Sequence, residues 1–242
     1  MILTIDAGNT RTKWGVFDEA GELVAQGALN NGQIERLALE DVAWDGCHRA
    51  VVSNVAGEAL GQPLRSLFAA RQLPVLWAKP EAETCGVTNG YAHPQQLGTD
   101  RWMALVAAWN RYQQPCVVAT AGTALTVDAL SAQGDFLGGL ILPGRTLMQA
   151  GLVAGAAALN IPLGELREFP TTTGDAVASG LAFAMAGAVE RQCAALERRE
   201  GSVRCLLSGG DARWLAAALP GTVEIADNLV LQGLFLIERE HP

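Results

Sequence analysis

The sequence predicts an α/β protein made of two similar halves, each with a mixed sheet and helices. Three observations support this prediction. Strand-like and helix-like segments alternate along most of the 242 residues. The chain opens with two strands joined by a glycine-containing turn, in the stretch ILTIDAGNTRTKWGVF from residue 2 to residue 17. A similar strand, turn and hairpin returns from Cys116 onward, near the middle of the chain.

The first strand delivers an acidic side chain to its turn, because the alternation that begins at Ile2 ends at Asp6. Gly8 lets the backbone approach a ligand closely. The turn and the second strand also carry groups that suit a phosphate tail, namely Asn9, Thr10, Thr12 and Lys13. An ionised carboxylate beside phosphate needs a cation between them, so Asp6 implies a divalent metal, hydrated Mg²⁺. The alternative is a plain hairpin with a Gly/Asn turn.

The first half continues as alternating strands and helices. In order, we expect strands at 2–7, 13–17 and 23–28, a short helix near 34–38, a strand at 50–52, a helix at 60–71 and a strand at 75–77. Residues 85–97 break the periodicity and predict a loop. Apolar residues at helical spacing follow from Trp102, so Thr99 and Asp100 are expected at a helix N-terminus.

The second half repeats the opening of the first. Ala121-Gly122 aligns with Ala7-Gly8, an offset of 122 − 8 = 114 residues, close to half of the chain. The duplication predicts two domains, residues 1–114 and 115–242, although two hairpins can also resemble one another by chance. The later elements expected are strands at 116–119 and 136–142, a helix after Pro143-Gly144, an irregular stretch at 162–173, a long helix at 175–199, a strand at 204–207 and helices at 212–219 and 229–240.

Composition limits the classes of partner and compartment. Seventeen Lys and Arg against 25 Asp and Glu give a net charge of −8, and no basic run is present, which disfavours nucleic acid as a partner. Five scattered cysteines without a C-x-x-C pair predict reduced thiols in a cytoplasmic protein. No signal peptide or membrane span is expected, because the apolar stretch around 137–163 is interrupted by Arg145 and Gln149.

Six motifs together resemble the type III pantothenate kinases, a branch of the acetate and sugar kinase, Hsp70 and actin superfamily. They are D-x-G-N-T at Asp6–Thr10, Y-x-x-P-x-x-L-G-x-D-R-W at Tyr91–Trp102, G-T-A-x-T-x-D at Gly122–Asp128, P-G at Pro143-Gly144, S-G-G-D at Ser208–Asp211 and L-V-L-x-G-L at Leu229–Leu234. D-x-G-N-T is shared across the superfamily, whereas G-x-D-R-W is specific to this branch. The resemblance covers nearly the whole chain and implies duplicated ribonuclease H-like (actin-like ATPase) domains with a cleft between them.

The resemblance implies transfer of the ATP γ-phosphoryl group to the hydroxyl of pantothenate, the first step of coenzyme A synthesis. It assigns Asp100 as the group that accepts or orients the hydroxyl proton, and a helix N-terminus favours an ionised carboxylate there. The residues expected to bind pantothenate are Tyr91, Gly98, Thr99, Asp100, Arg101 and Thr173. The residues expected to bind ATP are Asp6, Ala7, Gly8, Asn9, Thr10, Arg11, Thr12, Lys13, Gly122, Thr123, Gly209 and Gly210.

Two cations and a second subunit are also implied. Asp6 would hold Mg²⁺ through water, and Asp128 matches the family's ligand for a monovalent cation, K⁺ or NH₄⁺. The family's enzymes are homodimers, and Thr173 would be the residue that closes the partner's pantothenate pocket. Many relatives have Asn where this chain has Thr172, and an acid at the position of Thr120.

Two other functions remain open at this stage. The first is a different small-molecule kinase of the superfamily, acting on a sugar or a carboxylate, which would keep both phosphate loops without needing the G-T-D-R-W motif. The second is a nucleotide-binding regulatory accessory protein that has lost activity. The intact carboxylates Asp6, Asp100 and Asp128 argue against this loss, because a binding module would be free to drop Asp100.

Overall fold

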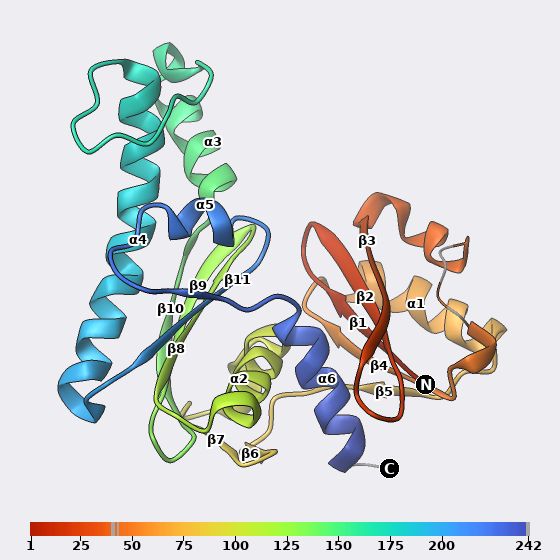
Figure 1. Ribbon diagram of the computed structural model, residues 1–242. Coiled ribbons are helices and arrows are strands. Elements are labelled where there is room, and N and C mark those ends of the chain that lie inside the picture. Colours follow the sequence, from red (N-terminus) through yellow and green to blue (C-terminus); the bar gives the residue numbers. More distant parts are fainter. Residues whose placement is uncertain (40–41, 43, 241–242) are drawn as a thin grey trace. The chain divides into compact units, whose positions relative to one another are not determined.

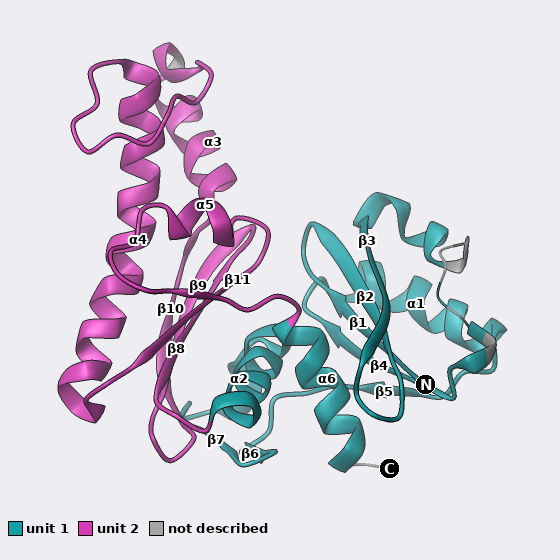
Figure 2. Ribbon diagram, viewed as in Figure 1, with its two compact units in different colours: residues 1–112, 229–242 teal, residues 113–228 magenta. Residues whose placement is uncertain are grey.

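The computed structural model describes residues 1–39, 42 and 44–240; residues 40–41, 43, 241 and 242 lie outside the described part. The chain divides into two compact units, shown in different colours in Figure 2. The first unit contains residues 1–112 and 229–242, and the second contains residues 113–228. The final helix, α6 (Leu229–Glu240), therefore packs with the first unit, whereas the predicted division into 1–114 and 115–242 places it in the second half.

The first unit is built on a mixed sheet with the strand order β3-β2-β1-β4-β5 (Figure 1). Its strands are β1 (Ile2–Ala7), β2 (Arg11–Phe17), β3 (Leu23–Asn30), β4 (Arg49–Asn54) and β5 (Val75–Trp77). The first three strands form an antiparallel meander, as predicted, and β4 runs parallel to both β1 and β5. A 3₁₀ segment, Asn31–Leu39, stands where the short helix was expected.

The two faces of this sheet have different roles. Leu3, Ile5 and Ala7 point into a core that also contains Leu64 and Phe68 of helix α1 (Glu58–Ala70). Because side chains alternate along a strand, Thr4 and Asp6 belong to the opposite face. Helices α2 (Thr99–Tyr112) and α6 pack on that side, since both contact β4 and α6 also contacts β1. Asp6 thus faces the layer of helices that includes Asp100, in the first turn of α2.

Part of the predicted loop at 85–97 belongs to a short hairpin. Strands β6 (Glu83–Thr84) and β7 (Val87–Asn89) pair antiparallel across Cys85 and Gly86, whose φ angles are 48° and 77°. Two consecutive left-handed residues form the turn that suits a two-residue hairpin loop. The strands are too short to show alternation in the sequence, which explains why the hairpin was not predicted. A single 3₁₀ turn, Pro94–Gln96, then leads toward α2.

The second unit repeats the strand arrangement of the first. Its strands run in the order β12-β11-β8-β9-β10, with bounds β8 (Cys116–Ala121), β9 (Ala124–Leu130), β10 (Asp135–Pro143), β11 (Arg204–Ser208) and β12 (Glu224–Ile225). Strands β8, β9 and β10 form an antiparallel meander, and β11 is parallel to both β8 and β12. The second meander therefore follows the pattern of β1, β2 and β3, as the internal repeat predicted.

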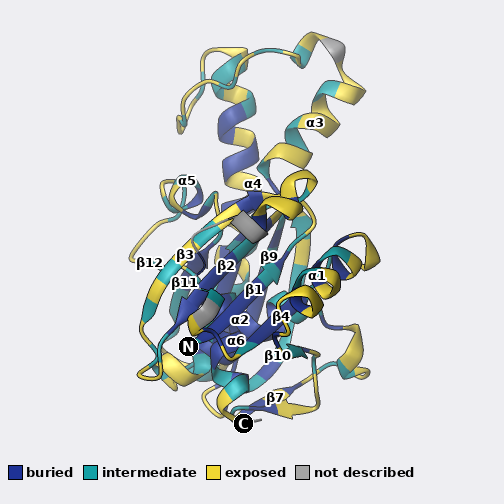
Figure 3. Ribbon diagram, turned by 90° about the vertical axis from the view of Figure 1, so that its right-hand side faces the viewer, coloured by how far each residue is buried: buried dark blue, intermediate teal, exposed yellow. Residues whose placement is uncertain are grey.

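Helix α4 (Thr173–Glu200) covers one face of the second sheet with Met185, Ala186 and Val189. The hydroxyl of Thr172 caps this helix by accepting a hydrogen bond from the backbone N–H of Asp175. Helix α5 (Ala212–Ala216) is shorter than predicted, and helix α3 (Arg145–Gly155) has no buried residue, as its colours in Figure 3 show. Within the described residues, no helix has the length and apolar character needed to cross a membrane.

Candidate active site

Asp6 occupies an electrostatically demanding position at the end of β1. Its Oδ1 atom is buried and has no hydrogen-bond partner within the described part of the chain. Burial, together with the negative charge of Asp100, raises the pKa of the Asp6 carboxyl from its ordinary value of 3.8 to about 7, and the cation of Lys13 partly opposes this shift. The fold therefore holds two acids near one another in the first unit, with the amine of Lys13 as a counter-charge.

Hydrogen bonds fix the conformation of the turn that follows Asp6. The backbone N–H of Gly8 donates to the Arg11 carbonyl at 3.2 Å, and a Cβ on Gly8 would lie only 3.1 Å from that same oxygen. The amide nitrogen of Asn31 donates to the Gly8 carbonyl at 2.8 Å, and the Thr12 hydroxyl donates to the Asn31 carboxamide oxygen at 3.1 Å. The loop residues Asn9 and Thr10 are exposed, which suits contact with a ligand.

Asp100 lies in the first turn of α2, as predicted. Its Oδ1 accepts a hydrogen bond from the backbone N–H of Arg101 at 2.9 Å. A Cβ on Gly98 would lie 2.6 Å from this oxygen, so a larger residue at 98 would displace the carboxylate. The net effect on ionisation differs from the expectation for a helix N-terminus. Burial raises the pKa of Asp100 above its ordinary value, against the lowering effects of the Arg101 N–H and guanidinium.

Arg101 and Tyr91 form a contact of two predicted substrate residues. Arg101 is only 6% exposed, and its Nη1 donates to the Tyr91 hydroxyl at 3.1 Å. Its guanidinium carbon also lies 5.8 Å from the centre of the tyrosine ring. The neighbouring Trp102 anchors the helix by donating from its indole N–H to the Thr84 hydroxyl at 3.3 Å. The first unit thus brings Asp6 near Asp100 and joins Tyr91 to Arg101.

Two glycine-containing loops of the second unit, at Gly144 and Gly209, converge on the loop that contains Gly122 and Thr123. Gly144 donates from its N–H to the Thr123 carbonyl at 2.9 Å, and a Cβ on Gly144 would lie 2.1 Å from the Gly122 carbonyl oxygen. Gly209 has a φ of +94°, and its Cβ would lie 2.3 Å from the Ala121 carbonyl oxygen. These two positions require glycine, and they place both the P-G and the S-G-G-D motif against the backbone of residues 121–123.

Asp128 is 2% exposed and lies on β9. Leu125, Val127 and Ala129 belong to the core beneath α4, so Thr126 and Asp128 share the opposite face of the sheet. The buried Oγ1 of Thr126 has no hydrogen-bond partner among the described residues. This face therefore offers a carboxylate and a hydroxyl two residues apart. Thr173, in contrast, is exposed at the first residue of α4.

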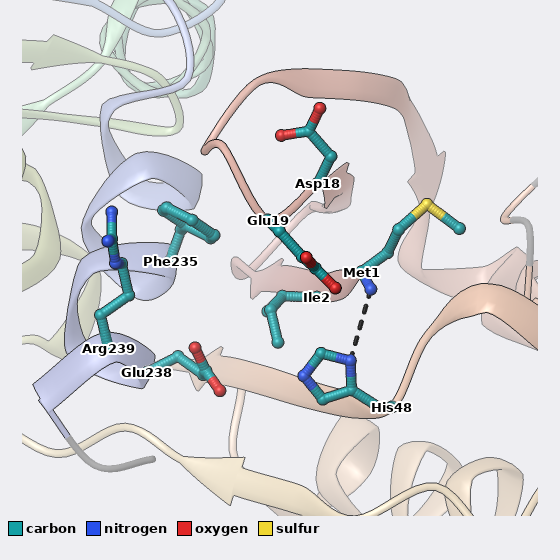
Figure 4. A pocket seen from close by; sticks show the side chains of 8 residues that line it. All are labelled: Met1, Ile2, Asp18, Glu19, His48, Phe235, Glu238 and Arg239. Atoms are coloured by element: carbon teal, nitrogen blue, oxygen red, sulfur yellow. Dashed lines mark hydrogen bonds between the residues drawn. The ribbon is translucent and has the colours of Figure 1, made fainter.

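A hollow of about 310 Å³ lies elsewhere in the first unit, beside the N-terminus (Figure 4). The ammonium of Met1 meets Nδ1 of His48 there at 3.3 Å, and α6 contributes Phe235, Glu238 and Arg239. The predicted ATP-binding and pantothenate-binding residues do not line this hollow. The hollow is therefore separate from the predicted site at Asp6.

The profile of the type III pantothenate kinase family matches residues 2–195. The chain belongs to the type III pantothenate kinase family. It is 44% identical to a type III pantothenate kinase of Methylobacillus flagellatus over 252 aligned residues, which cover 100% of this chain and 99% of that protein. The family that the motifs resembled is thus confirmed, and so is the expectation that the chain is a kinase.

Solved structures of low sequence identity confirm the fold class of this family member. A Campylobacter jejuni protein named as a Baf family transcriptional activator has a TM-score of 0.65 at 22% identity, covering 99% of this chain and 98% of that one. A 2-dehydro-3-deoxygalactonokinase protein from Sinorhizobium meliloti has a TM-score of 0.58 at 15% identity, covering 100% and 99%. Both support the duplicated actin-like architecture, and both are informative for fold alone.

Two residues near the Asp6 loop were not predicted from the sequence. Asn31 secures the Gly8 loop, and Ser53 pairs in register with Asp6 on the neighbouring strand β4. The Asn31-Gly32 pair directly after a strand was a signal for a turn-forming role. Ser53 carries no local signal, because strand pairing between β1 and β4 alone brings it beside Asp6.

Proposed function

We propose that this kinase transfers the γ-phosphoryl group of ATP to the hydroxyl of pantothenate, forming 4′-phosphopantothenate for coenzyme A synthesis. The observation that carries this proposal is that the carboxyl groups of Asp6 and Asp100 lie close enough to interact electrostatically, in a member of the type III pantothenate kinase family. Phosphoryl transfer depends on positioning and on neutralising charge more than on covalent chemistry. The Asp6 carboxylate would serve the metal and the nucleotide, and the Asp100 carboxylate would serve the acceptor hydroxyl.

Asp100 is proposed as the group that accepts the proton of the pantothenate hydroxyl. Its raised pKa brings the carboxylate nearer to working pH than an ordinary aspartate, which favours a general base. Arg101, fixed by its hydrogen bond to Tyr91, would bind the pantothenate carboxylate, because a guanidinium matches that group well. Gly98, Thr99 and Tyr91 would complete the pocket on this side.

ATP is proposed to bind to two loops, one in each unit. The first is residues 6–13, and the second comprises Gly122, Thr123, Gly209 and Gly210. A Cβ at Gly8 would lie 3.1 Å from the Arg11 carbonyl oxygen, and a Cβ at Gly144 would lie 2.1 Å from the Gly122 carbonyl oxygen, so side chains are kept away from the backbone of both turns. Such turns bind phosphate oxygens through backbone N–H groups. Lys13, opposite Asp6 in the strand register, adds a positive charge to the first loop.

Kinases of this kind use ATP with a divalent metal, and the site at Asp6 fits Mg²⁺. This ion keeps several waters and binds through one or two carboxylates and the phosphates of the substrate. The buried Oδ1 of Asp6, which lacks a bonding partner among the described residues, is a suitable acceptor for such a hydrated ion. When bound, Mg²⁺ would neutralise charge on the transferred phosphoryl group.

A monovalent cation, K⁺ or NH₄⁺, is proposed to bind at Asp128. The buried carboxylate and the hydroxyl of Thr126 on the same face form an oxygen donor set that fits a hard cation. Thr120 pairs with Thr126 in the strand register, so a hydroxyl stands where many relatives have an acid.

A homodimer is proposed, with Thr173 reaching the pantothenate pocket of the second copy. Large apolar side chains of the second unit are exposed on β10, on α3, in the loop after α3 and on α4, namely Ile141, Leu147, Leu152, Phe169 and Phe183. Contact with a second copy would remove such apolar side chains from water. All five cysteines are free, which suits the reducing cytoplasm.

The test is ADP release by the purified protein with ATP, Mg²⁺ and pantothenate, run in parallel in K⁺ and in Na⁺. We expect turnover that depends on pantothenate and is faster in K⁺. Turnover without pantothenate dependence, or with a sugar or another carboxylate as acceptor, would favour a different small-molecule kinase. ATP binding without turnover in either salt would favour a regulatory nucleotide-binding protein.

A further inference from the structure

Ser53 lies beside Asp6 in the sheet of the first unit. Strands β1 and β4 run parallel, and Asp6 pairs in register with Ser53. Residues paired in this way point to the same face of the sheet, and neighbouring strands are about 4.8 Å apart. On the other side of β1, Asp6 pairs with Lys13 of β2. A cation, a carboxylate and a hydroxyl therefore form one row across three strands.

The hydroxyl of Ser53 is buried without using its hydrogen-bonding capacity. Ser53 is 0% exposed, and its Oγ has no hydrogen-bond partner among the described residues. The adjacent Oδ1 of Asp6 is also buried and lacks a partner there. A buried polar atom without a hydrogen-bond partner destabilises the folded state. Two such atoms on neighbouring strands indicate that, in the working protein, a bound polar group supplies their missing hydrogen-bond partner.

A nearby hydroxyl shows how the same sheet treats a purely structural polar group. Thr4 is also 0% exposed and lies on the same strand and face as Asp6. Its Oγ1 donates to the Gly15 carbonyl of the neighbouring strand at 3.1 Å. The fold thus satisfies Thr4 internally and leaves Ser53 unsatisfied.

The surrounding charge favours a positively charged group in this place. Asp100 adds its negative charge to that of Asp6, and Lys13 supplies the opposing charge. A hydroxyl can accept a hydrogen bond from a cation-bound water and at the same time donate to a carboxylate. Ser53 therefore has the chemistry to join a hydrated cation to Asp6, which neither Lys13 nor Asp100 has.

We propose that Ser53 is a positioning residue for the hydrated divalent cation that accompanies the nucleotide. Its hydroxyl bonds a water of the cation and orients the Asp6 carboxylate toward it. This inference rests on the proposed function, because it assumes a phosphoryl-transfer site at Asp6. Groups that orient the ligands of a metal typically change metal affinity by 10–100-fold when they are removed.

The test measures Mn²⁺ binding in the presence of ADP, by the electron paramagnetic resonance signal of free Mn²⁺. For Ser53→Ala we expect an affinity for Mn²⁺ about tenfold lower than in the unchanged protein. In EDTA, the unfolding midpoint of Ser53→Ala should stay the same or rise, because the substitution removes an unsatisfied hydroxyl. The matched control, Thr4→Val, should lower that midpoint and leave Mn²⁺ affinity unchanged.

Two results would overturn this inference. The first is unchanged Mn²⁺ affinity in Ser53→Ala, and the second is a loss of metal-free stability like that of Thr4→Val, which would make Ser53 structural. The assay contains no pantothenate, so it separates this inference from the proposed function. A tenfold loss of Mn²⁺ affinity in a protein that does not phosphorylate pantothenate would support the role of Ser53 while refuting the acceptor.

Discussion

Arg145 and Asp211 form an ion pair in the second unit, with Nη2 of the arginine 2.7 Å from Oδ1 of the aspartate. The Arg145 guanidinium also lies over the ring of Trp214, 5.0 Å from its centre. The pair joins the first residue of α3 to the residue that precedes α5. Both segments are hydrogen-bonded to the stretch 121–123: the Gly144 N–H donates to the Thr123 carbonyl, and the Asp211 N–H donates to the Ala121 carbonyl.

We predict that this ion pair holds in place the second proposed ATP-binding loop, which comprises Gly122, Thr123, Gly209 and Gly210. Arg145→Gln and Asp211→Asn should each weaken ATP binding several-fold, and the double variant should be little worse than either single one. Because the pair is partly exposed, each change should cost no more than about 1 kcal/mol of stability. Calorimetric titration with ATP measures the effect. Additive losses in the double variant would show that the two residues act separately.

A second ion pair of the same unit provides a control for this prediction. Arg167 and Glu165 are paired in the loop before α4, and both side chains are largely exposed. Arg167→Gln removes the same charge as Arg145→Gln without touching the glycine-containing loops. Its ATP affinity should equal that of the unchanged protein. An equal loss in both variants would indicate a general effect of net charge.

The raised pKa of Asp6 predicts how stability depends on pH in the metal-free protein. The folded state retains a proton to about pH 7, whereas the unfolded chain releases it near pH 4. The free energy of unfolding should therefore fall as pH rises through this window, by at most about 4 kcal/mol. Asp6→Asn should remove this contribution and be more stable than the unchanged protein at pH 8.

Urea unfolding in EDTA at pH 5 and pH 8 measures this effect as the difference between the two proteins. Other titrating groups are common to both and cancel in that difference. The same variant should lose turnover, since it lacks the carboxylate proposed to hold the metal. Equal pH dependence in both proteins would contradict the assignment of the raised pKa to Asp6.

Asp100→Asn should lower kcat by at least about 100-fold and leave ATP binding intact, because the amide cannot accept the hydroxyl proton. Steady-state kinetics with pantothenate, together with titration of ATP, separate the two effects. Asp18→Asn is the matched control, because Asp18 lies in the β2–β3 turn, where its Oδ1 accepts local hydrogen bonds from the backbone N–H groups of Ala20 and Glu22, both at 2.9 Å. Unchanged turnover in Asp100→Asn would remove it as the base.

Gly233 allows α6 to pack closely on α2. A Cβ at this position would lie 2.0 Å from the carbonyl oxygen of Met103, so Gly233→Ala should cost about 1–3 kcal/mol of stability. Gly187 in α4 has no atom within 4 Å of such a Cβ, and Gly187→Ala should instead add about 0.5–1 kcal/mol. Thermal unfolding of both variants measures the contrast. A stable Gly233→Ala protein would show that the two helices can separate without cost.

Much of this protein could be predicted from its sequence, because the relevant signals are local. Alternation and helical spacing predicted β1, α2, α4 and α6, and the motif order identified the family. Each of these signals is contained within a few turns or one strand. The hairpin at Glu83–Asn89 was missed because strands of two and three residues carry no period, and the end of α5 was placed too late.

Tertiary structure alone decided the remaining features. Parallel pairing of β1 with β4 places Ser53 beside Asp6, and no local pattern encodes that register. Burial raises the pKa of both Asp6 and Asp100, and the charge of Asp100 adds to the shift at Asp6. At Asp100, burial outweighs the effect of the helix N-terminus that the sequence suggested. Close packing at Gly233 brings α6 back to the first unit. Sequence period specifies which segments form strands and helices, whereas contacts between distant segments determine the electrostatics of the site.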